Sequence, residues 1–196
     1  MSLPHYTRAT ELPATLAKRL VILDGAMGTM IQRFKLGEAQ YRGEGYSGAD
    51  GAGDRFTDFA YDVKGNNELL SITRPDVIRD IHEKYLAAGA DLIETNTFGA
   101  TTIAQDDYHM ADLAREMNLK SAQLARAACD KYSTPGHKRY VAGALGPTPK
   151  TASISPDVND PGARNVTFES LRKAYLEQTL ALIEGGADVI LVETIF

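Results

Sequence analysis

Short apolar runs alternate with stretches of helical periodicity along this 196-residue chain. Four runs rich in Val, Ile, Leu and Ala have the length and composition of buried strands. They lie at residues 20–24, 90–95, 140–145 and 188–193. Helical patterns lie at residues 27–35, 75–86, 102–132 and 168–184. Because strands covered by helices on both faces are apolar throughout, this alternation predicts an α/β fold with a parallel sheet.

Helix-breaking residues divide the chain into these elements. Pro75 opens one helical pattern and Gly89 ends it, as expected for the two ends of a helix. The pattern at 102–132 indicates one long helical region, which stops before the breaker at 133–136. Residues 37–65 are rich in glycine and too long for a simple connection, which predicts a functional or mobile loop. The last helical pattern carries its apolar side chains on one stripe, formed by Leu171, Tyr175, Leu176, Thr179, Leu180 and Ile183.

One unit occurs twice in the sequence. GADLIET at residues 89–95 and GADVILVET at residues 186–194 both follow a helical pattern. A repeated helix, Gly-Ala-Asp and short apolar strand indicates a parallel sheet or barrel of βα units. Sequential right-handed units place consecutive strands side by side, so we expect the spatial order 1-2-3-4. Ligands in such folds bind at the carboxyl ends of the strands, where both Glu-Thr pairs fall.

Three carboxylates end predicted strands: Asp24, Glu94 and Glu193. Each glutamate lies an odd number of residues after the aspartate of its own Gly-Ala-Asp unit. Because side chains alternate along a strand, both glutamates face the same way relative to the start of their units. Carboxylates in a shared mouth could bind an ammonium group, ligate a metal ion or exchange protons. The alternative is that they cap helices and tie loops. Spacing alone leaves both interpretations open.

Other polar residues lie beside these carboxylates. Asn96, Thr97 and Phe98 offer an amide, a hydroxyl and an aromatic wall directly after the second predicted strand. The asparagine doublet at residues 66–67 is typical of a turn. The glycines after the first strand lack the Gly-x-Gly-x-x-Gly spacing, which disfavours a dinucleotide-binding fold.

Composition narrows the function classes. The net charge of −5 comes without a basic cluster, which argues against nucleic acid or an anionic membrane as partner. No apolar run approaches the roughly 18 residues of a membrane span, and the N-terminus has no secretory signal pattern. The single cysteine, Cys129, excludes an intrachain disulfide, fits a cytoplasmic location and indicates packing inside a helix. Four histidines share no metal-ligand spacing and are expected mostly at the surface: His5, His82, His109 and His137.

Several segments resemble the homocysteine-binding domain of cobalamin-dependent methionine synthase. They are LDGAMGTMIQ (23–32), KGNNELL (64–70), ETNTF (94–98), GPT (146–148), TASISPDVNDP (151–161) and GADVILVET (186–194). The polar run at 153–161 resembles the methionine synthase branch more than the wider homocysteine methyltransferases. The chain departs from the family pattern at Ala26, where glycine is usual, and in a longer glycine-rich stretch at 47–58.

The resemblance implies a (β/α)8 barrel that binds zinc and homocysteine. In this family three cysteines from the second half of the barrel hold zinc, which lowers the pKa of the homocysteine thiol. Neighbouring modules supply folate and methylcobalamin, and the methyl group passes to homocysteine to give methionine. By resemblance, Asp24 and Glu193 hold the substrate amino group, and residues 94–98 form part of the pocket wall. The implied substrate-binding residues are Asp24, Gly25, Ala26, Met27, Glu94, Asn96, Thr97, Phe98 and Glu193.

We therefore expect the first half of a (β/α)8 TIM-type barrel, with an N-terminal extension at 1–19 and a truncated barrel domain at 20–196. The family's zinc cysteines have no counterpart here, so this chain is expected to hold no metal or other cofactor and to be inactive alone. The first and fourth strands would be open apolar edges, which predicts a homo-oligomer. Two alternatives remain: a non-catalytic, self-associating half-barrel, and a metal-dependent aldolase or lyase on an α/β barrel that uses the three carboxylates.

Overall fold

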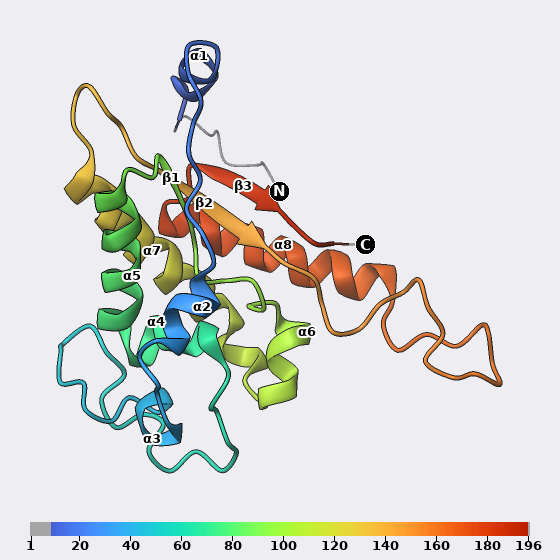
Figure 1. The fold of residues 1–196 in the computed structure, drawn as a ribbon. Coiled ribbons are helices and arrows are strands. Elements are labelled where there is room, and N and C mark those ends of the chain that lie inside the picture. Colours follow the sequence, from blue (N-terminus) through green and yellow to red (C-terminus); the bar gives the residue numbers. More distant parts are fainter. Residues whose placement is uncertain (1–8, 196) are drawn as a thin grey trace.

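The computed structural model describes residues 9–195. Long helices lie beside a small parallel sheet, and most of the short helices belong to the first half of the chain (Figure 1). The elements are α1 (Leu12–Leu16), α2 (Met27–Gln32), α3 (Glu38–Tyr41), η1 (Asn67–Leu69), α4 (Leu70–Thr73), α5 (Pro75–Ala88), β1 (Leu92–Glu94), α6 (Thr102–Gln105), η2 (Asp106–Tyr108), η3 (Ala111–Leu113), α7 (Ala114–Tyr132), β2 (Tyr140–Leu145), α8 (Phe168–Gly185) and β3 (Val189–Val192). Within this described range, no helix combines the length and the apolar character needed to cross a bilayer.

The sheet confirms the predicted parallel α/β architecture. Its strands lie in the order β1-β2-β3, with Leu92 opposite Tyr140 and Ala142 opposite Val189. The first predicted strand is present only as a parallel bridge from Leu23 to Leu92 at the β1 edge. The four predicted strands therefore follow the expected spatial order, but the first is shorter than the sequence indicated.

The two Gly-Ala-Asp repeats have the same local geometry. Gly89 and Gly186 both have φ of 109°, the left-handed conformation that ends α5 and α8. The aspartate that follows each glycine is buried and accepts a hydrogen bond from a backbone N–H of the preceding strand. Ile22 N donates to Asp91 Oδ2 at 2.9 Å, and Val141 N donates to Asp188 Oδ2 at 2.8 Å. Each repeat thus turns the chain out of a helix and fixes the new strand beside its neighbour.

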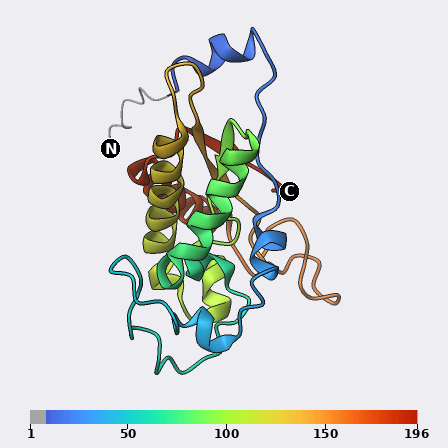
Figure 2. The same ribbon diagram turned by 60° about the vertical axis from the view of Figure 1, so that its left-hand side comes forward.

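The long helices pack side by side, and α7 contacts both α5 and α8 (Figure 2). At the α7–α8 contact, a Cβ atom added at Gly185 would lie 2.6 Å from Ala122 Cβ. The two helices can approach this closely only because glycine has no side chain. This close packing explains which face of α8 is buried. Its most buried residues are Ala174, Gln178, Ala181, Leu182 and Gly185, whereas the apolar stripe visible in the sequence is only partly covered.

The prediction of one long helical region at 102–132 is wrong. His109 has φ of 56°, which no α-helix accommodates, and the chain passes through α6, η2 and η3 before α7 begins. Gln105, at the end of α6, is buried and exchanges hydrogen bonds with the Asn66 side chain at 2.7 and 3.3 Å. This tertiary contact holds the end of α6 in place, where the α-helix stops. Helical periodicity in the sequence does not reveal a contact of this kind.

The glycine-rich segment at 37–65 packs against the body of the protein. Tyr41, Phe56 and Val63 are buried in the same core cluster as residues of α4 and α5. The Arg42 guanidinium donates to the carbonyl oxygens of Phe56 and Phe59 at 3.0 and 2.7 Å and so ties the segment to itself. The expected functional role of this segment stays a prediction.

One histidine is an exception to the expectation that most histidines lie at the surface. His82 on α5 is fully buried, and neither ring nitrogen has a hydrogen-bond partner within the described part of the chain. Burial disfavours the charged imidazolium and lowers the pKa of His82 to about 4. His109 is exposed, and His5 lies outside the described residues.

We predict that His82 makes the protein less stable in mild acid. The unfolded chain binds a proton at this residue near pH 6.5 and the folded chain only near pH 4. Neutral His82 therefore does not reduce the free energy of unfolding above pH 6.5. As the pH falls from 6.5 to 4, proton binding to the unfolded chain lowers the free energy of unfolding by about 3 kcal/mol. Urea unfolding of His82→Leu and wild type across this range measures the difference. The non-titrating control Ile81→Val, on the same helix, should keep the wild-type slope, and an unchanged slope in His82→Leu contradicts the prediction.

Candidate functional site

The three carboxylates predicted from the strand ends gather at the carboxyl edge of the sheet. Asp24 follows the bridge beside β1, Glu94 ends β1, and Glu193 follows β3. Burial raises the pKa of both Asp24 and Glu94, and a neighbouring negative charge adds to each shift: that of Glu94 for Asp24, and that of Glu193 for Glu94. Like charges held near one another in this way favour binding of a cation or a proton.

Asp24 combines one backbone hydrogen bond with a buried oxygen that has no partner among residues 9–195. Its Oδ1 accepts a hydrogen bond from the Glu94 backbone N–H at 3.1 Å. Its Oδ2 is buried and has no hydrogen-bond partner among residues 9–195. Burial, and secondarily the Glu94 charge, raises the pKa of the Asp24 carboxyl to about 7, although the hydrogen bond from Glu94 N opposes the shift. A buried carboxylate oxygen without a donor is costly for folding, so its retention points to a bound group.

The segment after Asp24 lies open to solvent. Gly25 and Ala26 are exposed, and Met27 begins α2 while its side chain packs on the core cluster of α4 and α5. A Cβ at Gly25 would lie 3.1 Å from the Tyr85 hydroxyl, which in turn donates to Ala26 O at 3.5 Å. Tyr85 on α5 therefore supports this turn from behind, a role that no motif in the sequence indicated.

Asn96 and Thr97 point into the protein rather than into an open mouth. Asn96 Nδ2 donates to Asn67 O at 2.7 Å, and Thr97 Oγ1 donates to Ala144 O at 2.8 Å. Both residues are buried, so their side chains shape the wall from within. Phe98 is 46% exposed and presents the aromatic surface of this segment.

Residues 66–68 hold this wall in place, a role that sequence reasoning missed. Glu68 Oε1 accepts a hydrogen bond from Gly99 N at 2.8 Å, and Gln105 Nε2 donates to Gly99 O at 2.9 Å. Burial raises the pKa of Glu68. Asn66 caps η1 by accepting from Leu69 N, which agrees with the turn interpretation of the asparagine doublet. The doublet was the available signal, but its neighbour Glu68 makes the contact with the wall.

The described residues do not fit a zinc site. No group of three or more His, Cys, Asp and Glu side chains in residues 9–195 is arranged to hold a metal ion. The Cys129 thiol is buried on α7, donates to Tyr140 O at 3.4 Å and has its pKa raised to about 12, chiefly by burial. It is a packing residue, as predicted. The three carboxylates at the sheet edge likewise form no metal-binding group.

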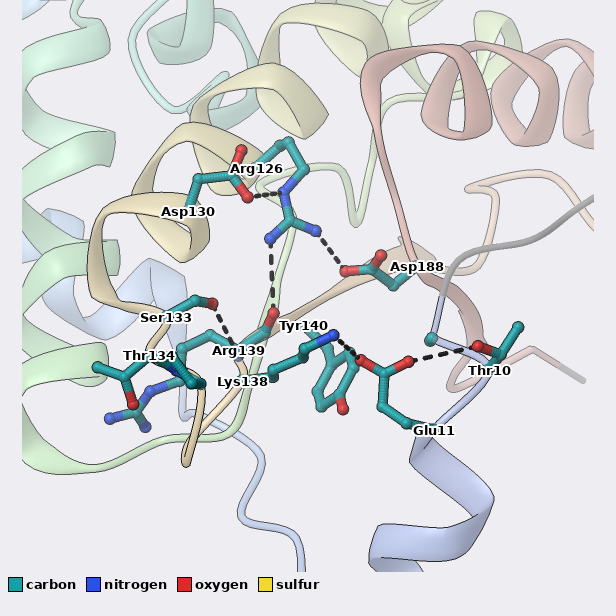
Figure 3. A pocket seen from close by; sticks show the side chains of 12 residues that line it. Thr10, Glu11, Arg126, Asp130, Ser133, Thr134, Lys138, Arg139, Tyr140 and Asp188 are labelled. Carbon is teal, nitrogen blue, oxygen red and sulfur yellow. Dashed lines mark hydrogen bonds and ion pairs between the residues drawn. The ribbon is translucent and has the colours of Figure 1, made fainter.

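A cavity lies at the opposite, amino-terminal ends of the strands (Figure 3). It measures about 890 Å³, and Arg126, Lys138, Tyr140 and Asp188 are among its lining residues. Two of its cations are already paired: Arg126 contacts Asp188 at 2.6 Å, and Lys138 contacts Glu11 at 2.7 Å. Because this cavity lies at the end of the strands opposite the three carboxylates, we do not assign the substrate site to it.

A parallel βα sheet with acidic side chains beyond the carboxyl ends of its strands is an arrangement found in α/β-barrel enzymes. Comparison with known families makes the assignment specific. Residues 21–196 match the homocysteine S-methyltransferase family, and the chain belongs to that family. This membership confirms the resemblance seen in the motifs. It favours a methyltransferase over the alternative of an aldolase or lyase.

Solved structures of MmuM, a homocysteine methyltransferase from Escherichia coli, share the fold. The metallated form matches with a TM-score of 0.66 at 23% identity, covering 95% of this chain and 58% of that chain. The oxidized form matches with a TM-score of 0.63 at 23% identity, covering 92% and 55%. The chain therefore spans somewhat more than half the length of these structures and has the fold of a partial TIM-type barrel.

We predict that Asp24 titrates near pH 7 and that Glu94 contributes to this value. In Glu94→Gln the backbone N–H that binds Asp24 remains while the neighbouring charge is removed, so the pKa of Asp24 should fall. Carboxyl ¹³C chemical shifts recorded against pH measure both values. Glu177→Gln, on α8, is the matched control and should leave Asp24 unchanged. An Asp24 carboxyl that titrates near 4 in the wild-type protein would show that the site is solvated.

Proposed function

We propose that this chain forms the substrate-binding part of a homocysteine S-methyltransferase of the methionine synthase type. The reaction is transfer of a methyl group from methylcobalamin to the homocysteine thiolate, which gives methionine. Family membership and the shared barrel fold support the substrate class. The polar run at 153–161 supports the methionine synthase branch by resemblance.

One observation carries the proposal: no donor from the described part of the chain binds the buried Asp24 Oδ2. A substrate ammonium group supplies both a donor and a positive charge, and the neighbouring charges of Glu94 and Glu193 attract the same cation. Homocysteine carries such a group. Asp24 and Glu193 are then the residues that hold the amino group, and Glu94 strengthens the negative potential between them.

The rest of the predicted set forms the walls of the site. The exposed ring of Phe98 offers an apolar surface to the methylene groups of the substrate. Gly25 and Ala26 line the turn beside Asp24, and Met27 fixes the start of α2 against the core. Asn96 and Thr97 act through their buried hydrogen bonds, which keep Phe98 in position.

Zinc is the metal that the family resemblance implies, and it would lower the pKa of the substrate thiol when bound. The described residues offer no donor set for it, so we assign it no step in this chain. These residues bind and orient homocysteine; that the chain is inactive alone stays a prediction. A cytoplasmic location, the folate and cobalamin modules as partners, and the division into 1–19 and 20–196 also stay predictions.

A second candidate, self-association, rests on the open edges of the sheet. The outer edge of β3 carries Val192, which is 63% exposed, and the opposite edge exposes Ile22 and Leu23. Exposed apolar edges pair readily with other chains unless charged residues protect them. This polypeptide studied alone is therefore a candidate for a homo-oligomer.

We predict that neutralising either amino-group ligand weakens homocysteine binding. In a protein that carries this segment within a complete barrel, Asp24→Asn or Glu193→Gln should raise the Kd by roughly ten- to a hundredfold. A charge-assisted hydrogen bond of about 1.5–3 kcal/mol has this effect. Isothermal titration calorimetry measures it. Asp58→Asn, an exposed loop variant, should bind like wild type, and unchanged affinity in both site variants removes these carboxylates from the site.

We predict that the 196-residue chain self-associates through its sheet edge. Sedimentation velocity should show dimers or larger species for wild type. Val192→Lys places a charge on the edge and should shift the distribution toward monomer. Val158→Lys introduces the same charge at a side chain that is 95% exposed in the connecting loop, and should leave the distribution unchanged. A wild-type monomer that unfolds cooperatively contradicts the prediction.

A further inference from the structure

The described part of the N-terminal segment, residues 9–19, lies at the amino-terminal end of the sheet, opposite the candidate site. From α1 the chain runs along the sheet edge to α2 at the other end (Figures 1 and 2). This segment precedes the family match, which begins at residue 21. Its side chains nevertheless form ion pairs with the rest of the protein: Glu11 pairs with Lys138 at 2.7 Å, and Arg19 pairs with Asp91.

Asp91 is the point where this segment meets the sheet. Arg19 binds the carboxylate through both terminal nitrogens, Nη1 to Oδ2 at 2.8 Å and Nη2 to Oδ1 at 2.7 Å. His137 Nε2 lies 2.6 Å from Oδ1, and Ile22 N donates to Oδ2 at 2.9 Å. The aspartate is only 2% exposed, and the Arg19 hydrogen bonds hold its pKa well below the ordinary value. Without a cation, a buried carboxylate of this kind is costly to keep ionised.

The Asp91 carboxylate sets the position of Asp24 through a short chain of backbone contacts. Ile22 is held on both sides, because its N–H binds the Asp91 side chain and its carbonyl accepts from Asp91 N at 2.8 Å and from Leu92 N at 3.0 Å. Two residues further along, Asp24 N donates to Leu92 O at 2.9 Å. The Asp24 carboxylate then meets Glu94 N. Within the described residues, this segment joins the sheet through one isolated bridge and the hydrogen bonds of Ile22 and Asp24.

The two Gly-Ala-Asp repeats differ in the origin of the arginine that pairs with the aspartate. Asp188 binds Val141 N in the same way, but its cation is Arg126 from α7, within the body of the barrel. At Asp91 the cation comes from the N-terminal segment. The strand with the weakest pairing therefore depends on a residue that lies before the family domain.

We propose that Arg19 and Asp91 are positioning residues for Asp24, so that the N-terminal segment helps to build the substrate site from the far end of the sheet. This inference rests on the proposed function for its consequence in binding. Its structural part, that the ion pair fixes the backbone from Ile22 to Asp24, is independent of the ligand.

Amide hydrogen exchange on the full chain tests the structural part. In Arg19→Gln the amides of Ile22, Asp24 and Glu94 should exchange about tenfold faster, since a partly exposed charge-assisted contact is lost. The amides of Asp188 and Glu193 at the far edge should keep their wild-type rates. Arg19→Lys, which keeps one cationic donor, should restore part of the protection. Lys18→Gln removes the same charge one residue away and should behave like wild type.

Two exchange results would overturn the proposal: unchanged rates at Ile22 and Asp24 in Arg19→Gln, or equal acceleration at all five amides, which indicates a loss of general stability. Homocysteine affinity, measured in a complete barrel, tests the consequence. Arg19→Gln should weaken binding severalfold and Arg19→Lys less. If neither wild type nor Asp24→Asn binds homocysteine, the proposed function fails while the exchange result still decides the positioning role.

Discussion

The structure depends on buried aspartates at the amino-terminal ends of its strands. Asp91 and Asp188 each accept a backbone N–H from the neighbouring strand, and each is neutralised by an arginine. A buried carboxylate without such a partner would destabilise the fold by several kcal/mol. Because each aspartate is placed by the left-handed glycine that ends the preceding helix, one short sequence fixes helix end, strand start and register together.

The acidic residues at the two ends of the strands have pKa values shifted in opposite directions. At the amino end, Asp91 has a guanidinium, an imidazole and an N–H around it, and its pKa is depressed. At the carboxyl end, Asp24 has one N–H and a neighbouring carboxylate, and its pKa is raised. The first arrangement stabilises the fold, and the second leaves a demand for a cation that the fold itself does not meet. This division is the one expected of α/β barrels, in which stability resides at one end of the strands and binding at the other.

Sequence patterns predicted those features that depend on local chemistry. The bounds of β2 and the start of α5 at Pro75 follow from apolar composition and proline preference, and the facing of Glu94 and Glu193 follows from strand alternation. The break at His109, the small-residue face of α8 and the burial of His82 depend on contacts between distant segments, so periodicity could not reveal them. The same holds for Asp24, whose unpartnered oxygen is set by what surrounds it in space.

The raised pKa of Asp24 gives the proposed site a property that its contacts alone do not describe. Near pH 7 the carboxyl is partly protonated, and an ammonium ligand favours only the ionised form. In the proposed site, binding of an ammonium ligand therefore releases a proton from the protonated fraction of Asp24, so that the ammonium group replaces the proton. The apparent affinity rises as the pH approaches 7 and levels off above it, and the heat of binding depends on the ionisation enthalpy of the buffer that takes up the proton.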